Sequence, residues 1–217
     1  MGTHRGVKRL DEFIRKESKN YRENIWILKC DISKFFDSIN HDILKNILFK
    51  KDLDNHTKWL VENVIKSFEK LPNRGLPLGN VTSQLFANIY LNEFDQFIKH
   101  ELRAKHYLRY CDDFVIVSRN KKYLESLILE IIESLKNKLD LSLHPRNVEI
   151  RKLSQGVDFL GYVRLLHYLV LRTNTKKRIL RRIQKIVSKE TVQSYLGVLS
   201  HCKGHKIAKI LIESKNG

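Results

Sequence analysis

Several features that other classes of protein require are scarce in this sequence of 217 residues. No apolar run approaches the roughly 18 to 20 residues needed to cross a bilayer, so we expect no membrane-spanning segment and no membrane partner. The first residues, MGTHRGVKRL, contain no apolar core, which argues against a secretory signal. The three cysteines (Cys30, Cys111 and Cys202) are scattered and show neither a CxxC nor a zinc-type Cys/His spacing. This pattern favours a reduced, cytoplasmic setting without disulfides.

Negative charge is also scarce. The chain has 41 Lys and Arg against 24 Asp and Glu, which gives a formal net charge of +17. The excess is concentrated in residues 144–217, with 16 basic against 4 acidic residues, whereas residues 1–143 have 25 against 20. Such an uneven basic excess favours a polyanionic partner, most often nucleic acid. A solvated basic surface is the other interpretation of the same numbers.

The spacing of apolar residues predicts helices that alternate with short strands. The segments with helical spacing are residues 7–19, 41–50, 55–69, 82–102, 121–139 and those from 174 onward. The segments rich in β-branched and aromatic residues are 25–32, the hairpin 106–118, and short strands near 147–152, 157–165 and 167–171. We therefore expect an α+β fold, in which a small antiparallel sheet flanked by helices is followed by a helical C-terminal part.

Acidic residues lie at the ends of two predicted strands. Asp31 closes the strand 25–32, and Asp112 and Asp113 form the tip of the hairpin. Carboxylates beside apolar strands repel one another, and a divalent cation would relieve that repulsion. Oxygen ligands of this kind suit Mg²⁺, and two ions roughly 3.5–4 Å apart could activate a hydroxyl and stabilise a leaving pyrophosphate. Taken singly, each feature is also explained as an ordinary Asp-rich turn.

Four segments resemble the motifs of reverse transcriptases, in the same order. Residues 31–37 (DISKFFD) resemble the first catalytic-aspartate motif, and residues 110–113 (YCDD) resemble the YxDD box. Between them, residues 75–84 (GLPLGNVTSQ) resemble the LPxGxxxSP motif, and residues 156–162 (GVDFLGY) resemble the later primer-grip motif. The resemblance covers roughly residues 2–200. It implies a polymerase palm followed by a helical thumb, and template-directed DNA synthesis on RNA by two-metal nucleotidyl transfer.

Two substitutions within these motifs indicate a subtype. Most reverse transcriptases have Gln at the position of Leu78 and Pro at that of Gln84. The string from Leu78 to Gln84 is similar to the enzymes of diversity-generating retroelements, which implies error-prone retroelement mutagenesis. A group II intron-like reverse transcriptase is an alternative, although those enzymes usually keep the Gln and Pro. An inactive nucleic-acid-binding fragment of palm and thumb is another.

The resemblance implies three sets of site residues. The catalytic residues are Asp31, Asp112 and Asp113, which with Ile32 form the metal site for two Mg²⁺ ions, or Mn²⁺ in their place. The nucleotide site comprises Phe35, Phe36, Leu78, Gly79 and Gln84. The nucleic-acid-binding residues are Lys176, Lys177, Arg181, Lys185, Gly161 and Tyr162.

Individual roles follow from the side chains. Phe36 would stack under the incoming sugar and exclude a 2′-hydroxyl, although the ring also suits a hydrophobic core, as we expect of Phe35. Gly79 would let the backbone approach the nucleotide, since it has no Cβ. Leu78 cannot hydrogen-bond where the family has Gln, so we expect relaxed base selection. Asn147 lies near the place where the family often has a Lys that protonates pyrophosphate.

The resemblance also divides the chain. Residues 1–24 would be a remnant of the fingers, residues 25–172 the palm and residues 173–217 a partial thumb. With most of the fingers missing, we expect weak or no polymerase activity from this chain alone. The implied partners are an RNA template, a DNA or RNA primer, deoxynucleoside triphosphates and a small basic accessory protein. The implied origin is a bacterial, archaeal or phage-encoded protein of the cytoplasm.

Overall fold

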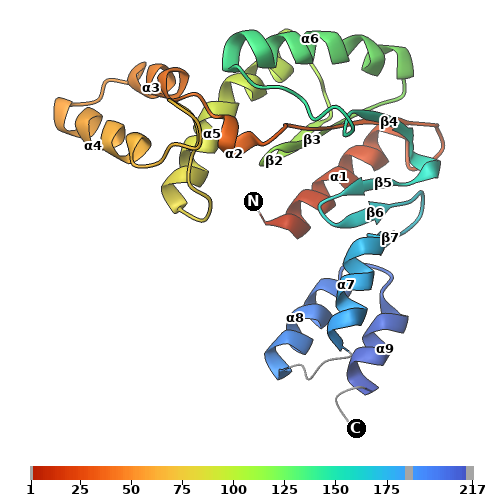
Figure 1. Ribbon diagram of the computed structural model, residues 1–217. Coiled ribbons are helices and arrows are strands. Elements are labelled where there is room, and N and C mark those ends of the chain that lie inside the picture. Colours follow the sequence, from red (N-terminus) through yellow and green to blue (C-terminus); the bar gives the residue numbers. More distant parts are fainter. Residues whose placement is uncertain (1, 184–187, 214–217) are drawn as a thin grey trace. The chain divides into compact units, whose positions relative to one another are not determined.

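The computed structural model describes residues 2–183 and 188–213 (Figure 1). The chain forms two compact units. The central unit is Leu28–Ile150, and the terminal unit combines Met1–Ile27 with Arg151–Gly217. The candidate catalytic acids all belong to the central unit, whereas the predicted primer-grip and thumb residues belong to the terminal unit.

The central unit contains β2, β3 and parts of β1 and β4 from a four-stranded sheet with the strand order β2-β3-β1-β4. The strands are β1 (Trp26–Asp31), β2 (Tyr107–Tyr110), β3 (Asp113–Ser118) and β4 (Glu149–Lys152). Strands β2 and β3 pair antiparallel, with Tyr107 opposite Ile116 and Tyr110 opposite Asp113. Four consecutive residues of β3, 114–117, are buried, as expected of an inner strand that is covered on both faces.

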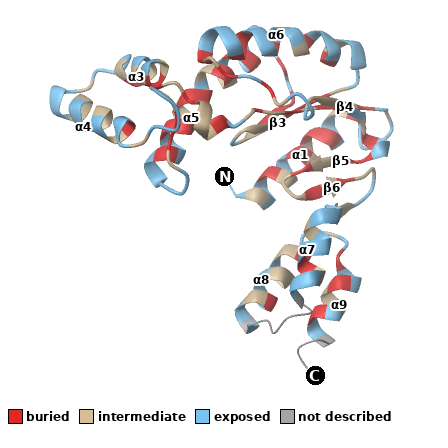
Figure 2. Cartoon of the chain, viewed as in Figure 1, coloured by how far each residue is buried: buried red, intermediate tan, exposed pale blue. Residues whose placement is uncertain are grey.

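The central unit also contains helices, and side chains cap several of them. They are α2 (Phe35–Ser38), α3 (His41–Phe49), α4 (Asn55–Lys66), α5 (Val81–Gln96), the π-helical continuation η1 (Phe97–Glu101) and α6 (Lys121–Leu139). The side chain of Asn40 accepts hydrogen bonds from the backbone N–H groups of Asp42 and Ile43 at the start of α3. Helix α6 lies over β3 and turns one apolar stripe toward the sheet, while its outer face is exposed (Figures 1 and 2).

The terminal unit contains a three-stranded antiparallel sheet, β5-β6-β7, and four α-helices within its described residues. Its elements are α1 (Thr3–Glu17), the short 3₁₀ helix η2 (Leu153–Gln155), β5 (Val157–Phe159), β6 (Tyr162–Arg164), β7 (Leu169–Leu171), α7 (Thr173–Ile183), α8 (Lys189–Leu199) and α9 (His205–Glu213). One hydrophobic core joins Tyr162 of β6 and Leu171 of β7 to Ile179, Leu199 and Leu211 of the three C-terminal helices.

The predicted α+β fold with small antiparallel sheets is confirmed. The compact units divide the chain differently from the predicted segments 1–24, 25–172 and 173–217, because β6 and β7 share their core with the C-terminal helices. The assignment of those segments to fingers, palm and thumb stays a prediction. Within residues 2–183 and 188–213, no helix combines the length and the apolar character that a bilayer crossing requires.

Candidate active site

The acidic turn, residues 110–113, joins β2 to β3 at the edge of the central sheet. Because Tyr110 pairs with Asp113, only Cys111 and Asp112 form the loop between the strands. Cys111 has φ +54°, in the left-handed region that non-glycine residues seldom adopt. The backbone N–H of Ile32 donates to the carbonyl of Asp112 at 3.2 Å. This bond brings Asp112 beside the end of β1, where Asp31 lies.

The carboxyl of Asp112 at this edge responds to its surroundings. Burial raises the pKa of the Asp112 carboxyl, and the negative charge of Asp31 adds to the increase. Asp31 Oδ2 in turn accepts a hydrogen bond from Asn147 Nδ2 at 2.9 Å. Asn147 lies near the place where the family often has a Lys. Its neutral side-chain amide therefore hydrogen-bonds to the carboxylate of Asp31, a candidate catalytic residue.

The donor set at this edge is compatible with Mg²⁺, although the carboxylates do not close a three-ligand cluster. Among the residues that the structure describes, no three His, Cys, Asp or Glu side chains are grouped to hold a metal ion, and Asp31, Asp112 and Asp113 are no exception. Mg²⁺ often takes only one or two carboxylates and completes its shell with water and substrate phosphates. A cation would also offset the mutual repulsion of Asp31 and Asp112. Ile32, the fourth predicted member, lies beside both through its backbone.

A pocket of about 310 Å³ adjoins the acidic turn. The five residues predicted to bind the nucleotide all line it: Phe35, Phe36, Leu78, Gly79 and Gln84. Phe35 is buried and meets the half-buried Phe36 edge to face, with 5.3 Å between the ring centroids. Leu78 is 75 % exposed, and its apolar side chain lines the pocket.

Five further residues line the pocket that the motifs had not singled out: Ala87, Asn88, Arg109, Tyr110 and Cys111. Asn88 follows Gln84 by four residues, and its side-chain amide donates to the Gln84 carbonyl at 2.9 Å. Helical periodicity would place these two on one face of α5 and could have identified Asn88. Arg109 directly precedes the YxDD-like box, but no periodicity distinguishes it from other charged residues.

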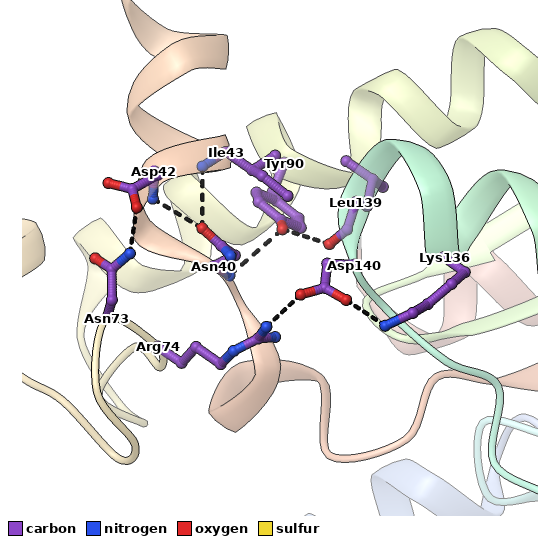
Figure 3. Close-up of polar contacts among 9 residues, drawn as sticks. All are labelled: Asn40, Asp42, Ile43, Asn73, Arg74, Tyr90, Lys136, Leu139 and Asp140. Carbon is purple, nitrogen blue, oxygen red and sulfur yellow. Dashed lines mark hydrogen bonds and ion pairs between the residues drawn. The ribbon is translucent and has the colours of Figure 1, made fainter.

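The motif loop, residues 71–80, carries Leu78 and Gly79 and is anchored by charged side chains. Arg74 of this loop pairs with Asp140, which follows α6, and Lys136 Nζ approaches the other oxygen of Asp140 at 2.5 Å (Figure 3). Hydrogen bonds from Lys136 and Arg74 lower the pKa of the Asp140 carboxyl. Nearby, the Tyr90 hydroxyl donates to the Leu139 carbonyl at 2.6 Å (Figure 3).

Backbone contacts continue this anchoring toward the pocket. The buried His41 donates from Nε2 to the Gly75 carbonyl at 2.7 Å, and the Leu76 N–H donates to the Phe36 carbonyl at 2.8 Å. Gly79 then turns with φ +93°, a conformation that L side chains rarely adopt. No atom lies within 4 Å of where a Cβ on Gly79 would be, so the backbone there is open to a ligand.

The predicted nucleic-acid residues are distributed over the terminal unit. Gly161 lies in the tight β5–β6 connection with φ +84°. Tyr162 is only 3 % exposed, and its ring belongs to the hydrophobic core, where its hydroxyl donates to the Val198 carbonyl at 3.2 Å. The exposed residues of α7 in this set are Lys176, Lys177 and Arg181. Lys185 lies outside the described residues.

Comparison with known proteins identifies the family. The family model described as "Reverse transcriptase (RNA-dependent DNA polymerase)" matches residues 2–164. Protein YkfC of Escherichia coli K12 is 27 % identical over 175 residues, 63 % of this chain and 46 % of that protein. The retron Ec73 reverse transcriptase of Escherichia coli is 26 % identical over 179 residues, 76 % and 55 % of the two chains. A putative COX1/OXI3 intron 2 protein of Saccharomyces cerevisiae is 22 % identical over 209 residues, 67 % and 24 %.

The chain thus spans about half or less of the length of these relatives. The fold resembles that of apo telomerase from Candida tropicalis truncated from its C-terminal domain, with a TM-score of 0.61 and 17 % identity over 79 % of this chain and 40 % of that one. The three relatives named above are not described as diversity-generating enzymes, so the subtype stays a prediction. The predicted family, in contrast, is confirmed: the chain belongs to the reverse transcriptase (RNA-dependent DNA polymerase) family.

Proposed function

We propose that the protein carries out template-directed DNA synthesis on RNA as part of a retroelement. The observation that carries this proposal is the position of the acids: Asp112 lies beside the end of β1, where Asp31 lies, and the turn that carries Asp112 adjoins the pocket lined by all five predicted nucleotide residues. A pocket of about 310 Å³ is within the range of small-molecule sites. Acids next to a pocket of this size favour a role in nucleotidyl transfer over the interpretation of an ordinary Asp-rich turn.

In this mechanism each residue has a defined task. Two Mg²⁺ ions, or Mn²⁺, would supply activation of the primer hydroxyl and stabilisation of the leaving pyrophosphate when bound. Asp31, Asp112 and Asp113 would hold them, and Asn147 would orient the Asp31 carboxylate through its amide. Phe36 would stack under the sugar of a deoxynucleoside triphosphate and exclude a 2′-hydroxyl.

The terminal unit would bind the RNA template and its DNA or RNA primer. Lys176 of α7 lines a second pocket, of about 600 Å³, together with Lys203 and Lys206. Cations gathered in this way favour phosphates, and their binding would release counterions from the nucleic acid. We also infer that the protein acts in the cytoplasm, where its three free cysteines would stay reduced. The small basic accessory protein stays a prediction from the resemblance.

The test is single-nucleotide extension of a labelled primer on an RNA template by the full chain. We expect weak Mg²⁺-dependent incorporation from this chain alone, and a loss of at least about a thousandfold in Asp112→Asn because several kcal/mol of transition-state stabilisation is removed. Asp52→Asn, which changes an exposed carboxylate outside the pocket, should have no effect. Tight template–primer binding without any metal-dependent incorporation would instead support the alternative of an inactive binding fragment.

We further propose that synthesis is error-prone, as in diversity-generating retroelements, because Leu78 provides no hydrogen bond at the pocket. Leu78→Gln should lower misincorporation opposite template adenine by roughly fivefold, since one hydrogen bond is worth about 1 kcal/mol. Leu85→Gln is the matched control, because Leu85 is 56 % exposed on α5 and does not line the pocket. Error rates that do not change in Leu78→Gln would contradict this proposal and would remove one objection to the group II intron-like alternative.

A further inference from the structure

Arg109 links the acidic turn to helix α5. Its guanidinium donates from Nε to Asp95 Oδ1 at 2.8 Å and from Nη2 to Asp95 Oδ2 at 2.7 Å, a bidentate pair. Its third nitrogen, Nη1, donates to the carbonyl of Cys111 at 3.0 Å. Both side chains of the pair are largely buried, with exposed fractions of 9 % for Arg109 and 19 % for Asp95. The guanidinium is therefore fixed by Asp95 of α5 on one side, and on the other side it hydrogen-bonds to the Cys111 carbonyl in the turn.

The carboxylate of this pair is itself anchored. The hydroxyl of Tyr107, a buried residue of β2, donates to Asp95 Oδ1 at 2.6 Å. The Tyr107 ring packs edge to face on Phe94 and Phe114, which belong to the core between α5 and β3. Asp95 consequently has little freedom to follow a displaced arginine. This rigidity matters because the guanidinium is planar and rigid. With Asp95 fixed, the position of the remaining N–H groups is fixed as well, and so is the carbonyl that they hold.

The carbonyl that Arg109 holds belongs to the residue with the least favourable backbone of the turn. Cys111 has φ +54° and lies between the paired residues Tyr110 and Asp113, next to Asp112. A non-glycine residue in this region is strained and persists only where its surroundings hold it. The charge-assisted bond from Arg109 is one such restraint. Released from it, the peptide between Cys111 and Asp112 could rotate and move the carboxylate of Asp112.

We propose that Arg109 is a positioning residue for the acidic turn: anchored on α5 through Asp95, it fixes the Cys111 carbonyl and thereby the direction of the Asp112 carboxylate. The proposal rests on the proposed function for the consequence in catalysis, but the restraint on the turn is independent of it. A small misplacement of a catalytic group can cost about a hundredfold in rate. Arg109 also lines the nucleotide pocket, so a direct contact with substrate is the role to be distinguished from positioning.

The terminal unit offers a matched control. Arg164, which is 7 % exposed, donates from Nε to Asp11 at 2.8 Å, from Nη1 to the Leu165 carbonyl at 2.6 Å and from Nη2 to the Tyr21 hydroxyl at 2.6 Å. The groups are the same as around Arg109: an arginine, an aspartate, a tyrosine and a backbone carbonyl. None of them is a predicted site residue. Substitution of Arg164 therefore removes an equivalent cluster without touching the turn.

The experiment compares Arg109→Lys with Arg164→Lys in the full chain. A lysine keeps the charge but cannot hold Asp95 and Cys111 together, so Arg109→Lys should lower kcat by about ten- to a hundredfold. The KM for the deoxynucleotide and the Kd for the template–primer should stay within about twofold, because a positioning residue contacts neither the deoxynucleotide nor the template–primer. Arg164→Lys should leave all three constants unchanged. A raised KM with unchanged kcat in Arg109→Lys would overturn the proposal and assign Arg109 to substrate binding.

A second readout needs no activity. Cys111 is exposed, whereas Cys30 is buried and Cys202 half-buried, so alkylation of Cys111 followed by mass spectrometry reports on the turn. Arg109→Lys should change the alkylation rate of Cys111 by at least about threefold, because thiol reactivity follows its local environment, and Arg164→Lys should not. An unchanged rate would overturn the positioning role even in an active protein. A changed rate in a protein that incorporates no nucleotide would leave the restraint standing, and it would support the inactive binding fragment over the proposed function.

Discussion

The central and the terminal unit contain nearly the same cluster of polar groups. In the central unit, Arg109 binds Asp95 and a backbone carbonyl, and Tyr107 donates to the same aspartate. In the terminal unit, Arg164 binds Asp11 and a backbone carbonyl, and Tyr21 contacts both side chains. Both arginines are largely buried. In each cluster the aspartate neutralises a guanidinium charge that would otherwise be costly to remove from water.

The clusters differ in the carbonyl that the arginine holds. Arg164 donates to Leu165, its own neighbour at the end of β6, so this bond restrains no distant segment. Its contact with Asp11 instead joins β6 to α1, which is a contribution to the fold. Arg109 donates to Cys111, inside a two-residue turn with a left-handed backbone and beside a candidate catalytic acid. The same interactions thus stabilise a fold in one unit and can define the geometry of a site in the other.

Removal of the aspartate charge from each cluster should have the largest effect on stability. Asp95→Asn and Asp11→Asn each leave a buried guanidinium without its counter-charge, so we expect each to lower the free energy of unfolding by about 2–3 kcal/mol. Urea denaturation followed by circular dichroism measures both. Nucleotide incorporation under conditions where both variants are folded should fall only in Asp95→Asn. Equal losses of activity in the two variants would show that the clusters do not differ in function.

The sequence predicted the elements that carry these clusters but not the clusters themselves. Apolar spacing identified the helix 121–139 and the hairpin 106–118, which appear as α6 and as β2 with β3. The pocket-lining residues Phe36 and Leu78 could be named because they belong to motifs. Periodicity, however, shows which face of an element is buried and not which polar partner it meets there. The pairings Arg109–Asp95 and Asn147–Asp31 depend on how separate elements pack, and local sequence does not encode that.

The predicted nucleic-acid-binding residues also show what residue type alone leaves open. Tyr162 was expected at a nucleic-acid surface, and its aromatic ring equally suits the core in which it is found. The charge contrast was easier to detect from sequence. Residues 1–27 and 151–217 carry 22 Lys and Arg against 7 Asp and Glu, a net +15, whereas residues 28–150 carry 19 against 17, a net +2. The basic excess of the protein therefore lies almost entirely in the terminal unit.

Neutralisation of α7 tests whether that contrast reflects nucleic-acid binding. The triple substitution Lys176→Gln, Lys177→Gln and Arg181→Gln should weaken template–primer binding by about tenfold near physiological salt and lower the slope of log K against log salt by about 2–3. Fluorescence anisotropy over a salt series measures both quantities. The matched control removes three exposed charges of the central unit, Lys51, Lys105 and Lys122. A control that weakens binding equally would show that only net charge matters.

The smallest effects should come from the two tyrosines, and they separate stability from positioning. Tyr107→Phe removes a buried donor to Asp95, and Tyr21→Phe removes the equivalent hydroxyl near Asp11, so each should cost about 1 kcal/mol of unfolding free energy. Because Arg109 keeps its bonds to Asp95 and Cys111 in Tyr107→Phe, incorporation should stay within about twofold of wild type. A loss as large as in Arg109→Lys would mean that the whole cluster, rather than the arginine, sets the turn.

The pH dependence of the unfolding free energy of Tyr107→Phe tests whether the Tyr107 hydroxyl is buried. Burial, together with the nearby Asp95 charge, raises the pKa of the Tyr107 phenol well above its usual range, so the folded protein keeps it neutral. The phenol of the unfolded chain ionises near its ordinary pKa of about 10. The contribution of Tyr107 to stability is therefore complete below about pH 10 and declines as the pH rises beyond it. Urea titrations of wild type and Tyr107→Phe from pH 7 to pH 11 should show a constant difference up to about pH 10 and a shrinking one above. A difference that shrinks already near neutral pH would mean that the hydroxyl is not held in the buried bond to Asp95.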